Sequence, residues 1–356
     1  MSRIRALVVE DSLTVRRHLC EVLASDPEIE VVGEADDGQR AIELCQTLRP
    51  DVVSMDMVLP VMSGLAATEY IMAYCPTPIL IVSSSANRGE LFHTYDALAA
   101  GAVDVLEKPR GDEPDGEWER MYLATIKLVA RISVIMHPRA RLASAIASSR
   151  RSRELPAARP AGEAGYRIVA IGASTGGPGA VVKLLHSLPA PFPLPILLVL
   201  HIGKPFGTAF AEWLDAQTEH RVVLAPDGEP VTSFAGRIVL APPDRHLVVR
   251  AGRLRLTDDP ERASCRPSID VLFESLATEY GASCIACVLT GMGRDGAAGL
   301  FGIRQAGGLT MAQDEASSVV YGMPREAIRL DAAVHVLSPR EIGAMLASAV
   351  RLQSAR

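Results

Sequence analysis

Three acidic side chains near the N-terminus have the chemistry of a metal site. Glu10 and Asp11 follow one apolar run of the sequence, and Asp56 follows another. Carboxylates that are brought together repel each other unless a cation lies between them, and hard oxygen ligands suit Mg²⁺. Ser83 and Lys108 follow two further apolar runs. A small hydroxyl and an ammonium group beside such a cluster would meet an anion carried on one of the carboxylates.

A second set of residues has the chemistry of acyl transfer, and it begins at Ser174. This serine lies in the sequence GASTGG at 172–177, which fits the pattern G-x-S-x-G. Glycines permit a sharp turn from a strand into a helix, which presents the serine hydroxyl where helix amides favour developing negative charge. The alternative is that Ser174 is an ordinary helix N-cap.

A nucleophilic serine needs a base, and His201 is the best placed of the eight histidines because it ends the buried strand-like run 195–200. His246 is the reserve candidate. Asp295, in the glycine-rich turn 291–296, could orient the imidazole and fix its tautomer. The alternative is a turn aspartate that bonds its own backbone.

The turn 291–296 also fits G-x-G-x-x-G, with Asp314 further along, so dinucleotide binding is a minor alternative. The charge of Asp295 would face a pyrophosphate, and the motif comes late in its domain, which disfavours this interpretation. Cys284 and Cys287 suggest a metal site, but residues three apart on a strand face opposite sides of a sheet. The order Ser174, His201, Asp295 also differs from the serine, acid, histidine order of α/β-hydrolases.

The elements that must position these residues follow an alternating pattern. In residues 1–110, segments of helical spacing alternate with strand-like apolar runs at 4–9, 29–34, 51–55, 78–82 and 103–106. This alternation predicts a parallel sheet with helices on both faces and with its chemistry at the carboxyl ends of the strands. A similar pattern starts again at residue 166. The segment 118–136 has helical spacing and is expected to close the first domain.

Length and composition set the domain plan. A chain of 356 residues predicts two or three domains, and 48% hydrophobic and 22% charged residues are typical of a globular protein. Residues 139–159 carry six arginines and a single glutamate among Ala, Ser and Pro, which is typical of a linker. We therefore predict a first domain at 1–110, a helical extension and basic linker at 111–165, and a larger domain at 166–356.

Composition and charge also limit where the protein can act and what it can bind. No apolar run is long enough for a membrane helix, and no secretory signal is visible, so we expect a cytoplasmic protein without membrane insertion. Six cysteines in a chain of this size do not make a disulfide framework and suit a reducing compartment. A net charge of −6 gives no reason to expect nucleic-acid binding.

Residues 1–110 resemble the receiver domain of two-component response regulators. The resemblance implies that Asp56 is the phosphoacceptor, that Glu10 and Asp11 hold Mg²⁺ together with it, and that Ser83 and Lys108 contact the phosphoryl group. A histidine kinase would then be the phosphodonor.

The first domain departs from the receiver pattern at three points. Leu59-Pro60 and Ser63-Gly64 replace the usual Met-Pro and Asp-Gly, and Val105 stands where receivers often have an aromatic switch residue. We expect phosphorylation to survive these changes and the aromatic form of the switch to be lost.

The whole chain resembles the chemotaxis response regulator protein-glutamate methylesterases, the CheB-type enzymes. The matching stretches are 172–177, 199–201, 266–270, 289–296, 312–316 and 321–324. The implied fold is a receiver-type, flavodoxin-like doubly wound α/β domain followed by a larger doubly wound parallel-sheet esterase domain. The implied function is phosphorylation-regulated hydrolysis of glutamate γ-methyl esters on methyl-accepting chemoreceptors, with deamidation of receptor glutamines.

The same resemblance assigns roles in the second domain. Ser174 would be the nucleophile, His201 the base and Asp295 its orienter. The Met292 backbone amide would help to hold the oxyanion, with Thr175 nearby. No cofactor is expected for the esterase step, because acyl transfer to water needs only a nucleophile, a base and oxyanion donors. The rival interpretation from another class is a phosphorylation-gated binding module whose second domain is inactive.

Overall fold

The computed structural model describes residues 3–84, 88–109, 116–132, 134 and 165–354. The chain divides into two compact units, Met1–Arg151 and Ser152–Arg356. The basic stretch 139–159, which the sequence predicts to be a linker, lies outside the described residues.

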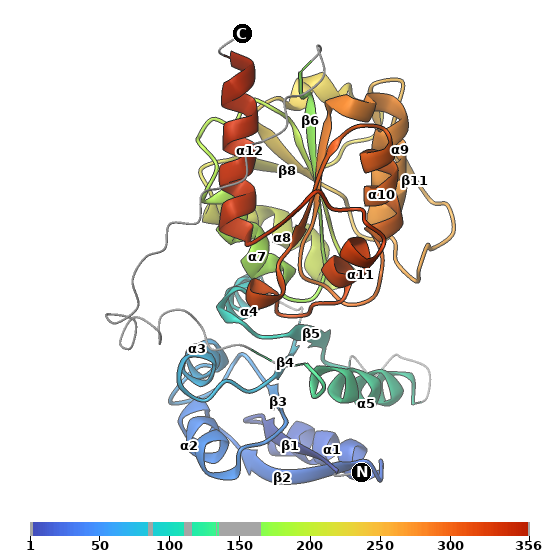
Figure 1. Cartoon of the computed structure of the whole chain (residues 1–356). Coiled ribbons are helices and arrows are strands. Elements are labelled where there is room, and N and C mark those ends of the chain that lie inside the picture. The colour runs from blue at the N-terminus through green and yellow to red at the C-terminus, as the bar shows by residue number, and fades with distance from the viewer. Residues whose placement is uncertain (1–2, 85–87, 110–115, 133, 135–164, 355–356) are drawn as a thin grey trace. The chain divides into compact units, whose positions relative to one another are not determined.

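The first unit is a five-stranded parallel sheet with helices on both faces. Its elements are β1 (Ile4–Val9), α1 (Leu13–Ala24), β2 (Ile29–Ala35), α2 (Gly38–Leu48), β3 (Val52–Met55), α3 (Gly64–Tyr74), β4 (Ile79–Ser83), α4 (Arg88–Ala100), β5 (Asp104–Glu107) and α5 (Glu117–Val129). The strand order is β2-β1-β3-β4-β5, which is the flavodoxin-like order. Helices α1 and α5 lie on one side of the sheet, and α2 and α3 lie on the other (Figure 1). The predicted receiver-type fold is confirmed.

Local sequence explains where these helices begin and end. Ser12 and Ser63 cap α1 and α3 by accepting amide hydrogen bonds, so the departure at Ser63 from the usual aspartate keeps a capping side chain. Helix α5 ends at Val129, before the end of the predicted 118–136, and residues 133, 135 and 136 of that segment lie outside the described residues. It closes with hydrogen bonds from the Arg131 and Ile132 amides to carbonyls three residues back, the tight geometry that commonly ends a helix.

The second unit is a seven-stranded parallel sheet with an added hairpin. Its strands are β6 (Ile168–Ala173), β7 (Ile196–Leu200), β8 (Arg221–Leu224), β9 (Arg237–Leu240), β12 (Cys284–Val288), β13 (Leu309–Gln313), β14 (His335–Leu337), and the antiparallel pair β10 (His246–Arg250) and β11 (Arg253–Thr257). Its main helices are α7 (Gly177–Leu185), α8 (Lys204–Gln217), α9 (Ile269–Tyr280), α10 (Ala297–Gln305), α11 (Met323–Arg329) and α12 (Pro339–Ser354). Helices α7 and α12 lie on one side of the sheet, and α9 and α10 lie on the other (Figure 1). The predicted larger doubly wound domain is confirmed.

The strand order of this sheet decides where a site can form. The order is β14-β13-β12-β6-β7-β9-β8, so the chain leaves β6 first toward β7 and later returns to β12 on its other side. In such sheets ligands bind at the carboxyl ends of the strands on either side of this reversal. Strands β6, β7 and β12 are buried along their whole length, which explains their uninterrupted apolar sequences.

Helix α12 shows how closely local sequence and structure agree. The amide of Ser338 donates to the Glu341 carboxylate at 2.9 Å, and the amide of Glu341 donates back to the Ser338 hydroxyl at 3.4 Å. This is a capping box, with Pro339 at the first helical position.

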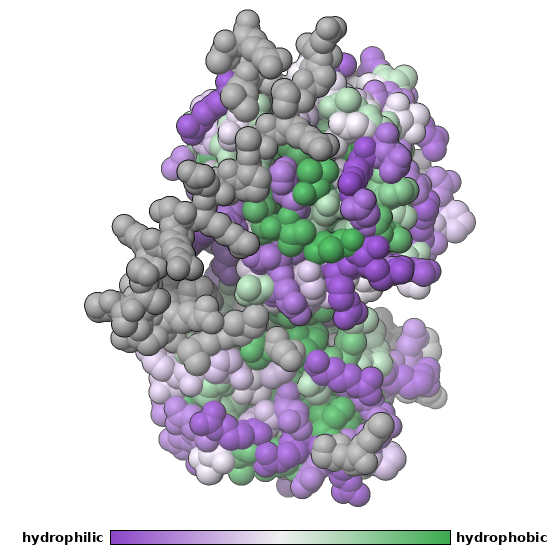
Figure 2. Space-filling view, viewed as in Figure 1, coloured by the Kyte–Doolittle hydropathy of each residue, from purple (hydrophilic) through white to green (hydrophobic). Residues whose placement is uncertain are grey.

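Surface character is that of a globular protein. In Figure 2, hydrophilic side chains cover much of the visible surface of each unit, with hydrophobic areas between them. Among the described residues, no helix combines the length and the apolar character needed to cross a bilayer.

Candidate active site

Three neighbouring strands of the second unit bring Ser174, His201 and Asp295 to one edge of the sheet. Ser174 follows β6, His201 follows β7, and Asp295 lies in the loop after β12. The Ser174 amide donates to the Thr290 carbonyl at 3.0 Å, and the His201 amide donates to the Ala173 carbonyl at 3.0 Å. Backbone pairing therefore continues past the strand ends and fixes the first two residues.

The serine turn leaves the Ser174 hydroxyl unused by the fold. The N-cap of α7 is Gly176, not Ser174. Gly176 has φ = 74°, and a Cβ atom at this position would lie 2.5 Å from the Cβ of Val319. Within the described part of the chain, no hydrogen bond involves the Ser174 hydroxyl. The structure therefore does not use this serine as a helix cap, and its hydroxyl is available for chemistry.

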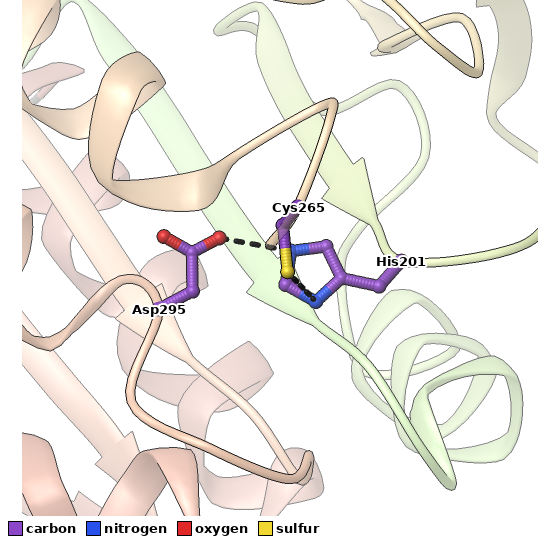
Figure 3. Close-up of side chains that lie close together, drawn as sticks. All are labelled: His201, Cys265 and Asp295. Atoms are coloured by element: carbon purple, nitrogen blue, oxygen red, sulfur yellow. Dashed lines mark hydrogen bonds and ion pairs between the residues drawn. The ribbon is translucent and has the colours of Figure 1, made fainter. Parts of the chain in front are cut away.

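The Asp295 carboxylate is held by many donors and contacts the imidazole of His201. The distance from His201 Nε2 to Asp295 Oδ2 is 2.9 Å (Figure 3). The other donors to this carboxylate are the Ser268 hydroxyl at 2.7 Å and the amides of Ile269 at 2.7 Å and Asp270 at 3.0 Å. These donors belong to the start of α9, so Asp295 does not bond the backbone of its own turn.

Electrostatics favour a charged pair at this contact. Burial alone would lower the pKa of His201, but the hydrogen bond to Asp295 and the nearby Cys265 raise it to about 9. Burial alone would raise the pKa of Asp295, but His201 and the α9 amides outweigh burial and hold it below its usual value. The imidazolium that forms when His201 takes a proton is therefore stabilised.

Cys265 is a neighbour of the imidazole that sequence reasoning did not find. Its Sγ lies 3.7 Å from His201 Nδ1, on the nitrogen that does not face Asp295 (Figure 3). The two residues are 64 positions apart, and no pattern in the sequence pairs them. Sequence reasoning also missed Ser268, because its hydroxyl reaches Asp295 from a loop other than the one that carries Asp295.

Thr290 connects the serine turn to the loops around it. Its buried hydroxyl donates to the Thr175 carbonyl at 3.0 Å and accepts from the Val320 amide at 2.9 Å. Its own amide donates to the Gln313 side chain at 2.7 Å. One small side chain thus holds three segments at the edge of the sheet.

The predicted oxyanion donor lies on a turn that packs against the serine. A Cβ atom at Gly291 would lie 2.7 Å from the Ser174 Cβ. The next residue, Met292, is 46% exposed. Within the described part of the chain, the Met292 amide makes no hydrogen bond. Thr175 lies beside Ser174 and is half-buried.

The alternative candidates have structural roles. His246 is fully buried, its Nδ1 accepts from the Ser268 amide at 3.1 Å, and its Nε2 pairs with the Pro260 carbonyl at 3.2 Å. Both of its nitrogens are used, so it is not the base. Cys284 and Cys287 are fully buried, and burial raises the pKa of both thiols, which makes thiolate ligands unfavourable.

In the first unit, two of the predicted metal-binding carboxylates, Glu10 and Asp56, pair with Lys108. Lys108 Nζ lies 2.8 Å from Glu10 Oε2 and 2.9 Å from Asp56 Oδ2. Oxygens of Glu10, Asp11 and Asp56 lie within 4.8 Å of one another. Ser83 is buried at the end of β4, and its carbonyl accepts from the Lys108 amide at 3.0 Å.

The charges of this cluster depend on one another. Burial raises the pKa of Glu10 and of Asp56, because a carboxylate is less stable away from water. The positive charge of Lys108 lowers the pKa of both carboxyl groups and so offsets part of the effect of burial. Three oxygen donors, two of them buried and Asp11 exposed, fit a hard cation that keeps water ligands.

Together these features define a class of protein: a response regulator whose second domain has the site of a serine hydrolase. A family model described as the CheB methylesterase matches residues 169–346, and one described as the response regulator receiver domain matches residues 6–114. The chain belongs to the CheB methylesterase family.

Two curated relatives match nearly the full length. A "Protein-glutamate methylesterase/protein-glutamine glutaminase" of Nitrosospira multiformis is 44% identical, over 98% of this chain and 97% of that protein. "Protein-glutamate methylesterase/protein-glutamine glutaminase 2" of Anaeromyxobacter dehalogenans is 42% identical, over 95% of each. The similarity therefore covers both domains in the same order.

Proposed function

We propose that this chain hydrolyses glutamate γ-methyl esters of chemoreceptors to glutamate and methanol, and deamidates receptor glutamines, by means of Ser174, His201 and Asp295. The observation that carries the proposal is the convergence of these residues at three adjacent strand ends, with the His201–Asp295 hydrogen bond at 2.9 Å. The names of the relatives support the same activity.

The reaction follows from the tautomer of His201. In the neutral form of His201 that acts as the base, Nε2–H donates to Asp295, so the lone pair is on Nδ1, which takes the proton of the Ser174 hydroxyl. The Ser174 oxygen attacks the ester carbonyl, and the Met292 amide, with Thr175 nearby, stabilises the oxyanion. His201 returns the proton to the departing methoxide, which leaves as methanol.

The second half of the reaction restores the enzyme. Water attacks the acyl-serine while His201 takes one of its protons, and Ser174 leaves with that proton as glutamate is released. With a receptor glutamine the leaving group is ammonia instead of methanol. We assign no cofactor to this domain, because these steps use only the nucleophile, the base and the oxyanion donors.

The receiver would control this activity through Asp56. We assign Asp56 as the phosphoacceptor, with a histidine kinase as phosphodonor. Glu10, Asp11 and Asp56 would hold Mg²⁺, which neutralises charge during phosphoryl transfer when it is bound. Ser83 and Lys108 would hold the phosphoryl oxygens.

We retain the division into a receiver at 1–110, a helical extension and linker at 111–165, and a catalytic domain at 166–356. We also propose that the protein acts in the cytoplasm. All six cysteines are free, which suits a reducing compartment.

The test is methanol release from a methylated receptor by the wild-type chain and by Ser174→Ala. Because Ser174 supplies the attacking oxygen, we expect the variant to lose roughly a factor of 10⁴ in turnover. Circular dichroism should show that its fold is unchanged. A folded variant with a near-normal rate would exclude the serine. A wild-type chain that accepts phosphate on its receiver yet releases no methanol would favour the binding-module alternative.

A further inference from the structure

We propose that Cys265 and His201 form a binding site for a thiophilic divalent cation, with Zn²⁺ as the ion that fits best, and that this cation inhibits the esterase. The inhibition rests on the proposed role of His201 as the base. Binding of the cation does not rest on that role, because it depends on the positions of Cys265, His201 and the outer partner Asp295 and not on catalysis.

The spacing of the two donor atoms matches a shared tetrahedral ion. Cys265 Sγ and His201 Nδ1 are 3.7 Å apart. Zinc–sulfur and zinc–nitrogen bonds of about 2.3 and 2.0–2.1 Å at a tetrahedral angle place sulfur and nitrogen about 3.6 Å apart. A zinc ion can therefore bind both atoms with little movement of either side chain.

The partner of the other ring nitrogen completes the arrangement. In the neutral form of His201, Nε2–H donates to Asp295 at 2.9 Å, so Nδ1 has the lone pair that a metal binds in place of a proton. A histidine that ligates a metal usually donates its second N–H to a carboxylate, which fixes the ring and increases its basicity. Asp295 is itself held by Ser268 and by two amides of α9, so this outer partner is rigid.

The backbone places the Cys265 thiol and leaves it accessible. Arg262 and Cys265 exchange backbone hydrogen bonds across a tight turn, in which Ala263 and Ser264 both have positive φ. Cys265 is half-buried, and the His201 side chain is 14% exposed, so an ion can enter and water can fill its remaining positions.

Without a metal, the Cys265 thiol does not have to bond to Nδ1 of His201. Cys265 Sγ also lies 3.5 Å from the Ala263 carbonyl, which can accept the thiol proton and leave Nδ1 free for Ser174. A metal displaces that proton and binds Nδ1, so the lone pair that would take the serine proton is lost. Mg²⁺ prefers oxygen ligands, so the receiver ion and the inhibitory ion would not exchange sites.

Binding is tested with Co²⁺ as a spectroscopic probe, on the full chain with Mg²⁺ in excess to fill the acidic cluster of the receiver. We expect a thiolate-to-cobalt charge-transfer band that Zn²⁺ abolishes by competition. The band should be absent in Cys265→Ser and in Cys265→Ala. It should persist in Cys20→Ser, the matched control, because Cys20 is the other half-buried cysteine. Asp295→Asn should weaken binding about 10- to 100-fold, as loss of an outer partner does.

Inhibition is tested by titrating Zn²⁺ into the methanol-release assay, with each variant scaled to its own zinc-free rate and with reversal by a chelator. The Zn²⁺ concentration for half-inhibition should rise at least about tenfold in Cys265→Ser and stay unchanged in Cys20→Ser. Equal sensitivity of wild type and Cys265→Ser, or a wild-type chain without the cobalt band, would overturn the proposal. A cobalt band with unimpaired methanol release would overturn the inhibition and count against His201 as the base.

Discussion

Asp295 has the most demanding role of any single residue in the catalytic unit. Its carboxylate receives one hydroxyl, two amides and the imidazole of His201, and it is almost fully buried. A buried carboxylate with this many donors stays ionised and fixed in place, which keeps the imidazole in one tautomer. This explains why the pair can be charged although burial opposes charge.

Asp295→Asn tests this tautomer directly. The amide of the variant would present an N–H to Nε2, which moves the ring proton to Nδ1 and removes the lone pair that, in the proposed mechanism, takes the Ser174 proton. We expect turnover to fall by about 10³- to 10⁴-fold with little change in KM, as measured by steady-state methanol release. A change in KM with turnover intact would show that Asp295 binds substrate or only shapes its turn.

At the scale of elements, the site depends on how tightly two turns pack. A Cβ atom at Gly291 would lie 2.7 Å from the Ser174 Cβ and 2.4 Å from the Met323 Sδ. The Met323 side chain can rotate away, but the Ser174 Cβ is closer than a side chain allows, so Gly291→Ala must shift the serine turn or the turn at Gly291 itself. A shift of about 1 Å costs about 100-fold in rate when a reacting group is misplaced.

We therefore expect Gly291→Ala to lower kcat by about 10- to 100-fold while the protein stays folded. Gly302→Ala is the matched control, because a Cβ atom there would meet only Ala277 at an ordinary 3.8 Å. Steady-state methanol release should separate the two variants. Equal, unimpaired rates would mean that the close packing of these turns does not position the serine.

The start of α9 also carries a charge that costs stability. The Asp270 carboxylate is buried, and burial, together with the nearby Asp295, raises its pKa to about 6. Because its folded-state pKa exceeds the unfolded value, the protonated form stabilises the fold at low pH. That stabilisation is lost as the pH rises from about 4 through about 6. At about 1.4 kcal/mol per pKa unit, the loss is about 3 kcal/mol.

Asp270→Asn should remove this pH dependence. Relative to wild type, its free energy of unfolding should improve by up to about 3 kcal/mol between pH 4 and pH 7. Urea unfolding followed by Trp213 fluorescence, in a Trp118→Phe background, reports on the catalytic unit alone. A difference between variant and parent that does not change with pH would show that Asp270 titrates normally in the folded state.

Elements were the easiest level to predict from the sequence. Ser174 and Asp295 lie in glycine-rich turns that follow apolar runs, and His201 ends such a run directly, so local pattern and parallel-sheet logic place them at one edge. Cys265 and Ser268 could not be found in this way. They lie in a loop after the β10–β11 hairpin, and their positions beside His201 and Asp295 depend on tertiary packing that no local periodicity encodes.

At the scale of the whole molecule, the chain joins a charge-sensitive domain to a catalytic one. The receiver cluster places Lys108 between Glu10 and Asp56, so a phosphoryl group on Asp56 would change the balance of charge around that lysine. Val105 stands where an aromatic switch residue is common, so we expect any response to run through Ser83 and Lys108 instead. Receivers act by shifting a two-state equilibrium, and we expect the unphosphorylated receiver to restrain the esterase.

The central claim, a serine esterase gated by phosphorylation, is tested most directly by comparing methanol release in three samples. These are the full chain without a phosphodonor, the full chain with a phosphodonor and Mg²⁺, and a fragment that begins at residue 166. The phosphodonor should raise the rate of the full chain, Asp56→Ala should stay at the basal rate, and the fragment should be active without phosphate. Equal rates in all three samples would contradict the account, because the receiver would then not control the esterase.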